Sequence, residues 1–264
     1  MGILYAALSL GALGLVFGIL LGFASKKFEV KVDPKIPKLR ECLPSANCGG
    51  CGYAGCDAYA EAVASGDAKP NLCSVGGAPV AEALGEVLGV SVETGAKMTA
   101  FVKCAGNCEK AKQNYEYEGV TNCLEASLLV GGGAKKCSYG CLGLASCVNV
   151  CEFDALHRVD GIAKVDKEKC TMCGACIDIC PMGLIEAVPY DKKVRVACNS
   201  QDAGKDVRNA CSAGCIGCKI CEKNCPKGAV KVDGFLAKVD YENCVNCKIC
   251  TTKCPTKAIS FLEN

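Results

Sequence analysis

The sequence contains little of the chemistry on which most enzymes depend. Its 264 residues include one histidine and no tryptophan, and basic side chains outnumber acidic ones by only two. One histidine is a poor supply for Ser-His-Asp hydrolysis or for a histidine-rich zinc centre. A net charge of +2 gives no reason to expect a nucleic-acid partner. The composition therefore argues against the commonest hydrolases and against nucleic-acid binding.

Nucleotide-binding motifs are missing as well. No G-x-G-x-x-G pattern follows a strand-like segment, the glycines at 131–133 have the wrong spacing, and Gly204-Lys205 lacks the preceding glycine of a P-loop. His157 follows a cysteine motif and is expected at the surface or in a loop. We therefore expect no catalytic residue in this chain.

Cysteine is what the sequence has in abundance, because 26 cysteines make up nearly a tenth of it. Disulfide scaffolds reach this fraction in short secreted chains. This chain is long, half of its residues are hydrophobic, and many of its cysteines follow C-x2-C-x2-C spacings. Metal ligation is therefore the better interpretation.

The N-terminal segment, residues 1–25, contains no charged side chain, and Lys26 and Lys27 follow directly. At ~1.5 Å per residue a helix of this length covers about 36 Å, more than the ~30 Å hydrocarbon core of a bilayer. We expect a single transmembrane helix in the inner (plasma) membrane, with all later residues on the cytoplasmic side by the positive-inside rule. The alternative, a cleaved signal peptide, lacks its basic n-region.

Three segments repeat the spacing C-x2-C-x2-C-x3-C-P, which is typical of [4Fe-4S] ligands. They contain Cys170, Cys173, Cys176 and Cys180; Cys215, Cys218, Cys221 and Cys225; and Cys244, Cys247, Cys250 and Cys254. A divergent fourth copy lies upstream and contains Cys137, Cys141, Cys147 and Cys151. Within each pair of neighbouring copies, the third cysteine of one copy lies 29 residues before the third cysteine of the next, and the two fourth cysteines have the same separation. This equal spacing indicates internal duplication into two tandem ferredoxin modules.

Each module is expected to contain a β-hairpin, because an Asp-Gly turn separates alternating apolar residues in segments 158–166 and 231–240. In two-cluster ferredoxins the fourth cysteine of each motif ligates the other cluster. The predicted ligand sets are Cys137, Cys141, Cys147 with Cys180; Cys170, Cys173, Cys176 with Cys151; Cys215, Cys218, Cys221 with Cys254; and Cys244, Cys247, Cys250 with Cys225.

Two more cysteine groups precede the modules. One, with spacing C-x2-C-x4-C-x16-C, consists of Cys48, Cys51, Cys56 and Cys73. Its glycines let the backbone bend around an inorganic core, so an iron-sulfur cluster is favoured, with zinc as the alternative. The other, Cys104, Cys108 and Cys123, lacks an obvious fourth ligand. We expect Cys198 or Cys211 to complete a sixth [4Fe-4S] cluster, and Cys42 to remain a plain thiol.

The expected architecture is α+β, with a single N-terminal transmembrane helix, a small helical 4Fe-4S domain and two tandem two-cluster ferredoxin-like modules. The predicted boundaries are 1–25 for the anchor, 26–40 for a linker, 41–95 for the four-cysteine domain, 96–132 for a linking cluster region, 133–190 for the first module, 191–211 for a linker and 212–264 for the second module.

The order of these segments resembles a known family. An uncharged N-terminal helix, the block from Asn47 to Cys56 with Cys73, the block from Cys104 to Cys123, and the ferredoxin pairs together look like the B subunit of the Rnf complex, its iron-sulfur component. The resemblance covers essentially the whole chain. It implies that the protein takes electrons from reduced ferredoxin and passes them to membrane, flavin-carrying and NAD-binding subunits, coupled to pumping of Na⁺ or H⁺.

Alternative functions share the polyferredoxin part. An electron-transfer component of a hydrogenase, formate dehydrogenase or carbon monoxide dehydrogenase assembly needs neither the Cys48 block nor this N-terminal helix. A storage or scaffold protein with unconnected clusters is a third interpretation. Charge favours a docking role, because residues 215–257 hold eight lysines against four acids and soluble ferredoxins are commonly acidic.

Overall fold

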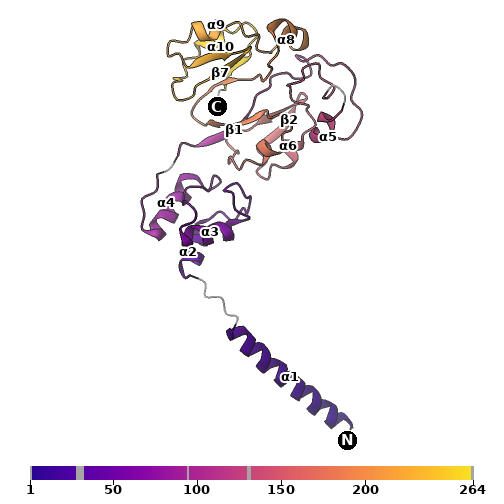
Figure 1. The fold of residues 1–264 in the computed structure, drawn as a ribbon, viewed down its shortest axis with the longest axis vertical. Helices are drawn as coiled ribbons and strands as arrows, with labels where there is room; N and C mark the ends of the chain where they lie inside the picture. Colours follow the sequence, from indigo (N-terminus) through magenta and orange to yellow (C-terminus); the bar gives the residue numbers. More distant parts are fainter. Residues whose placement is uncertain (1, 28–32, 94, 130–131, 263–264) are drawn as a thin grey trace.

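A computed structural model describes residues 2–27, 33–93, 95–129 and 132–262. The expected N-terminal helix forms as α1, Gly2–Lys27, and lies at one end of the molecule (Figure 1). Among the described residues, no helix combines the length and the apolar character that crossing a membrane requires. The prediction of a transmembrane anchor over 1–25 is therefore wrong, and so is the single-pass location with cytoplasmic cluster domains that followed from it.

Three helices form the small domain that contains the first cysteine group. They are α2 (Lys35–Cys42), α3 (Cys56–Ser65) and α4 (Gly77–Leu88). Their core includes Leu39, Tyr59, Val63 and Leu84, each at most 2% exposed. Gly66 caps the C-terminus of α3, and its φ of +84° is the left-handed conformation that glycine adopts without a Cβ clash. The prediction of a mostly helical unit is confirmed here.

The first ferredoxin module contains two antiparallel strand pairs. The hairpin joins β2 (Leu156–Val159) to β3 (Ile162–Val165) through Asp160 and Gly161. Both turn residues have positive φ, +50° and +75°, as a type I′ turn requires. The predicted hairpin is therefore confirmed.

The other strand pair joins distant parts of the chain. Strand β1, Met98–Val102, pairs with β4, Ile185–Pro189, with Met98 opposite Pro189. This strand belongs to the segment expected to link the domains, yet it completes the first module. Two short helices, α6 (Ser146–Asn149) and α7 (Ala175–Asp178), pack against each other in the same module, and α5 (Cys123–Ser127) precedes them.

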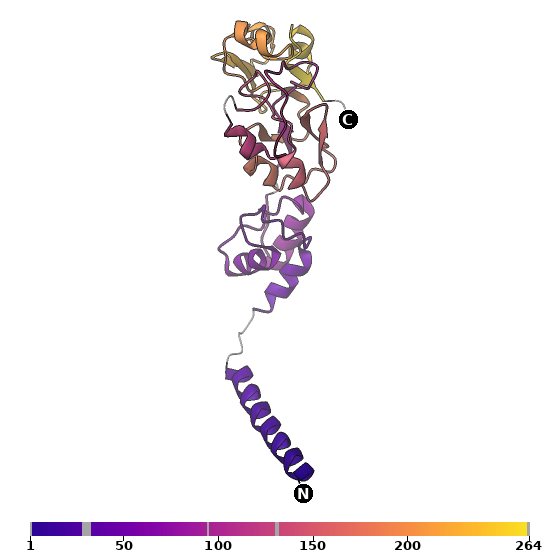
Figure 2. The same ribbon diagram turned by 90° about the vertical axis from the view of Figure 1, so that its right-hand side faces the viewer.

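The second module repeats this plan. Its hairpin is β6 (Val230–Asp233) with β7 (Leu236–Val239), and its second pair is β5 (Val194–Val196) with β8 (Ile259–Phe261). Two short helices, α9 (Ile220–Lys223) and α10 (Ile249–Lys253), contact each other. Helix α8, Gly204–Ala210, lies between β5 and α9 along the chain. Figure 2 shows the helical domain between α1 and the two modules.

Candidate iron-sulfur cluster sites

Cysteines form part of the core of every domain rather than only its surface. All 26 lie in described segments, and none of them forms a disulfide. Ten of them are buried, and the core clusters of both modules and of the helical domain contain cysteines. Twenty-four of the 26 gather in six groups of four, which are called sites A to F below.

Site A lies in the helical domain, in a cavity at the start of α3. Its thiols are Cys48, Cys51, Cys56 and Cys73. The Asn47 side chain fixes the loop, because its Oδ1 accepts a hydrogen bond of 2.9 Å from the backbone N–H of Cys56. The N–H of Gly76 points at the Cys73 sulfur, 3.4 Å away. The Ser74 hydroxyl, which also lines this cavity, is buried without a protein partner. This set is the one predicted from the sequence.

Site B lies in the first module. Its thiols are Cys151, Cys170, Cys173 and Cys176. The backbone N–H of Ala100 on β1 donates to the Cys170 sulfur at 3.4 Å, and that of Ala155 donates to the Cys151 sulfur at the same distance. Burial and the other three thiols raise the pKa of Cys176 to about 12. The structure brings together the four residues that crosswise pairing predicts.

Site C lies in the same module, in a cavity lined by residues of α6 and by residues that follow α7, and its membership differs from the prediction. Its thiols are Cys123, Cys141, Cys147 and Cys180. Cys123 takes the place expected for Cys137. It starts α5, where its backbone N–H donates to the Ser146 hydroxyl at 2.8 Å, which ties α5 to the start of α6. Burial, followed by the neighbouring thiols, raises the pKa of Cys147 to about 12.

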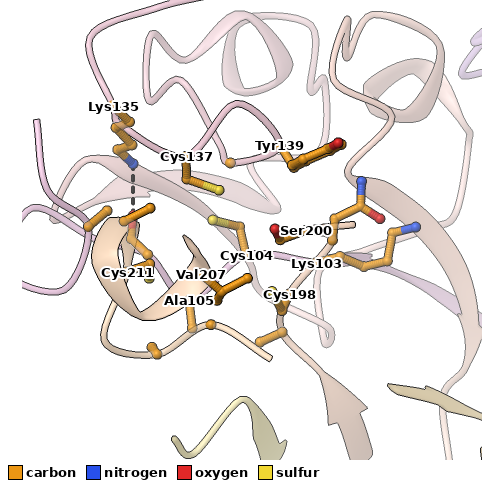
Figure 3. Close-up of a pocket in the computed structure, with 18 residues that line it drawn as sticks. Lys103, Cys104, Ala105, Lys135, Cys137, Tyr139, Cys198, Ser200, Val207 and Cys211 are labelled. Atoms are coloured by element: carbon orange, nitrogen blue, oxygen red, sulfur yellow. Dashed lines mark hydrogen bonds between the residues drawn. The ribbon is translucent and has the colours of Figure 1, made fainter. Parts of the chain in front are cut away.

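Site D is lined by segments of both modules, and Figure 3 shows its side chains. The cavity is lined by Cys104, Cys137, Cys198 and Cys211. The sulfurs of Cys104 and Cys137 are turned toward each other, with Cys198 and Cys211 below them in this view. The wall comes from four separate segments of the chain, including α8 through Val207 and Ala210. The sequence left open whether Cys198 or Cys211 joins Cys104; the structure places both at this cavity.

The structure does not place Cys108 and Cys123 with Cys104, as the sequence predicted. Cys108 is exposed and lines none of the four cysteine cavities described above, and Cys123 belongs to site C. Cys42 is half-buried and its thiol donates to the Lys38 carbonyl at 3.3 Å. His157 is exposed on β2, as expected.

Sites E and F belong to the second module. Site E contains Cys215, Cys218, Cys221 and Cys254; site F contains Cys225, Cys244, Cys247 and Cys250. In each site, burial and then the other three thiols raise the pKa of one cysteine to about 11, Cys221 in site E and Cys250 in site F. The N–H of Ala237 donates to the Cys215 sulfur at 3.4 Å, as Ala100 does to Cys170 in site B. Crosswise grouping is thus present in the second module.

A repeated backbone feature presents the third cysteine of each ferredoxin motif. The residue before each short helix has a left-handed conformation: Ala145, Gly174, Lys219 and Lys248, with φ between +58° and +91°. Each helix then carries one cysteine of one site, and the fourth cysteine that follows it belongs to the neighbouring site. The paired helices α6 and α7, and likewise α9 and α10, therefore join the two sites of a module.

The donor set fits a cationic inorganic core with four thiolate ligands. One thiol in each of sites B, C, E and F has its pKa raised by burial and by the neighbouring thiols, and a positively charged core at the centre offsets both effects. Backbone N–H groups directed at the sulfurs are the partners that cluster sulfurs use. Within the described segments, no three His, Cys, Asp or Glu side chains are placed to share a single metal ion.

Comparisons with known proteins agree with these sites. Residues 43–75 match the family described as "Putative Fe-S cluster", residues 163–186 a 4Fe-4S binding domain, and residues 214–258 a 4Fe-4S dicluster domain. These ranges contain site A, parts of sites B and C, and sites E and F.

Curated relatives resemble most of the chain. The B subunit of the Na⁺-translocating ferredoxin:NAD⁺ oxidoreductase complex of Acetobacterium woodii is 46% identical over 234 residues, 88% of this chain and 70% of that protein. The B subunit of an ion-translocating oxidoreductase complex of Methanosarcina acetivorans is 46% identical over 251 residues, 95% of each chain. A proton-translocating counterpart of Clostridium ljungdahlii is 45% identical over 230 residues, 86% of this chain and 81% of that protein. The chain therefore belongs to the Rnf B-subunit family of ion-translocating oxidoreductase complexes, and it is an iron-sulfur electron-transfer subunit.

Proposed function

We propose that the chain holds six [4Fe-4S] clusters, one at each of sites A to F, and forms a continuous electron relay from its last module to its helical domain. When bound, each cluster supplies a centre that accepts and releases one electron without breaking a bond in the protein. The single observation that carries the proposal is that every site touches the next.

Contact between sites A and B joins the helical domain to the first module. Gly50, between two thiols of site A, packs so closely on the backbone of Cys173 that an added Cβ would lie 2.6 Å from the Cys173 carbonyl oxygen. The charge of Cys48 is among the causes that, after burial, raise the pKa of Cys173. At Gly50 the backbone of the site A loop therefore lies directly against the backbone of Cys173.

Contacts at site D join the two modules. The backbone N–H of Cys141, a site C residue, donates to the Cys104 sulfur of site D at 3.4 Å. On the other side, the charge of Cys215 in site E is among the causes that, after burial, raise the pKa of the Cys198 thiol of site D. The order of contacts is therefore A, B, C, D, E, F, with α6–α7 and α9–α10 joining the two sites of each module.

The second module supports a role as the docking face for a reduced ferredoxin, the donor named for relatives of this chain. One thiol of each of its sites is exposed, Cys218 in site E and Cys247 in site F. A lysine follows each of them directly. The exposed thiols give a short path from the protein surface to the clusters, and the positive field of the lysines attracts an acidic electron carrier. We further propose that the electrons continue from site A to the flavin-carrying and NAD-binding subunits of a ferredoxin:NAD⁺ oxidoreductase.

The test combines metal content with reduction kinetics on the full chain. Six clusters predict about 24 irons and as many acid-labile sulfides per chain, whereas about 16 would leave only the two modules loaded and overturn the relay. Charge reversal then tests docking. The lysines reversed to glutamate in the second module are Lys219, Lys223 and Lys253, and a matched control reverses Lys35, Lys38 and Lys69 of the helical domain.

At low ionic strength we expect the first triple variant to slow reduction by an acidic ferredoxin about tenfold, because steering fields change association rates by at least that factor. The control variant should leave the rate unchanged. Equal rates in both variants, or a rate that does not respond to salt, would contradict docking at the second module and leave the cluster assignment intact.

A further inference from the structure

Site D differs from the other sites in having a buried lysine in its wall. Lys135 is 7% exposed and lines the cavity together with the four thiols of site D. Its ammonium donates to the carbonyl oxygen of Gly106 at 2.8 Å and to that of Gly161 at 2.9 Å. Figure 3 shows the first of these bonds beside Cys211. The lysine thus ties the loop after Cys104 to the β2–β3 turn.

A buried ammonium needs compensation by negative charge, because desolvation of an unpaired ion costs several kcal/mol. Two carbonyl dipoles supply part of it. No Asp or Glu lies among the described residues that line the cavity, and no ion pair of Lys135 occurs among them. The nearest groups able to carry negative charge in this wall are the four thiolates of site D.

The two lysines of the cavity wall differ in their partners. Lys103, the other lysine of the cavity wall, has Glu186 as an ion-pair partner at 3.4 Å. Among the described residues, Lys135 is therefore the lysine of this wall that has no carboxylate partner, so its charge acts on the sulfurs of site D.

We propose that Lys135 is a positioning residue that raises the reduction potential of the cluster at site D and so sets the step by which electrons cross between the two modules. The inference rests on the proposed function, since it requires a cluster at this site. Reduction adds one electron and hence one negative charge to the site, while no proton is taken up. A fixed buried cation stabilises the reduced state more than the oxidised state, because the reduced state is more negative.

The experiment is an anaerobic redox titration of the full chain followed by electron paramagnetic resonance, with iron counted on the same samples. Lys135→Gln removes the charge and keeps an amide donor for the two carbonyls. Lys135→Arg keeps the charge, and Lys136→Gln removes the charge of the exposed neighbour. The signal of site D is the one that disappears in Cys211→Ser.

Lys135→Gln should lower the potential of that signal so that, at a fixed applied potential, its reduced-to-oxidised ratio falls about tenfold, or about 59 mV for one electron. Lys135→Arg and Lys136→Gln should keep the wild-type potential. An unchanged site D potential in a fully loaded Lys135→Gln protein would overturn the inference but not the relay. Wild-type protein that lacks site D iron would instead overturn the relay itself.

A second variant keeps the test decisive if Lys135→Gln fails to assemble site D. Asn199 lines the same cavity, is half-buried, and becomes Asp with almost no change of shape. Asn199→Asp adds a negative charge and should lower the same potential, and the isosteric variant leaves both Lys135 hydrogen bonds in place. If it shifts no potential, fixed charges in this wall do not control the site, and the role of Lys135 is refuted.

Discussion

Replacement of Gly50 by alanine tests whether electrons reach site A through the contact with Cys173. An added Cβ would lie 2.6 Å from the Cys173 carbonyl oxygen and 3.0 Å from its Cα. Ordinary contacts begin at 3.4 Å, so one backbone must retreat by about 0.8 Å. Neither atom belongs to a side chain that can rotate away, and overpacking of this kind costs about 1–3 kcal/mol. The contact between the helical domain and the first module is therefore weakened.

The assay is rapid freezing of the full chain after mixing with a reduced ferredoxin, with the cluster signals followed by electron paramagnetic resonance. In Gly50→Ala we expect sites B to F to be reduced at the wild-type rate and site A to be reduced more slowly, with iron content unchanged. The control is Gly95→Ala, because a Cβ there meets nothing within 4 Å and the backbone needs no left-handed conformation. Wild-type kinetics of site A in Gly50→Ala would refute the contact as the electron path.

Three further substitutions test ligation and the helical core. Cys123→Ser should lower the iron content by about four per chain, one cubane, whereas Cys108→Ser should leave it unchanged; equal losses would refute the composition of site C. Leu84→Ala, at a fully buried position of the helical core, should cost about 2–5 kcal/mol, measured by denaturant unfolding of the loaded protein. Tyr59→Phe removes the hydroxyl that donates to the Lys69 carbonyl and accepts from the Leu72 N–H, so it should cost about 1–3 kcal/mol, and a loss below about 0.5 kcal/mol would show that water replaces these bonds.

Sequence patterns correctly predicted the features that depend on residues close together in the chain. Three-cysteine loops, the first hairpin turn and site A each lie within a short stretch of chain, and the structure has them as expected. In the second hairpin one extra residue moves the turn, so that Gly234 and Phe235, rather than Asp233 and Gly234, connect the strands. The spacing of the apolar residues alone did not show this change.

Site C and site D were mispredicted for a physical reason. Spacing indicates which cysteines share a loop, but it does not indicate which loops meet in space. Cys123 and Cys137 exchange places because β1 pairs with β4 across more than 80 residues, which brings the loop after β1 to the first motif. Lys135 carried no signal at all, because a lysine two residues before a cysteine looks like any solvated charge until its burial is known.

The order in which the cysteines leave the ribosome follows from the composition of the sites. Site A has its last cysteine at 73, so it can be loaded before any other site is complete. The first cysteine of site D is residue 104 and its last is residue 211. All eight cysteines of sites B and C lie between these two positions in the sequence. Because domains fold as units from the N-terminus during synthesis, site D closes only after the first module has all of its ligands. A chain that stops between residues 181 and 210 therefore has all the ligands of sites A, B and C but lacks a ligand of site D, which connects them to the second module.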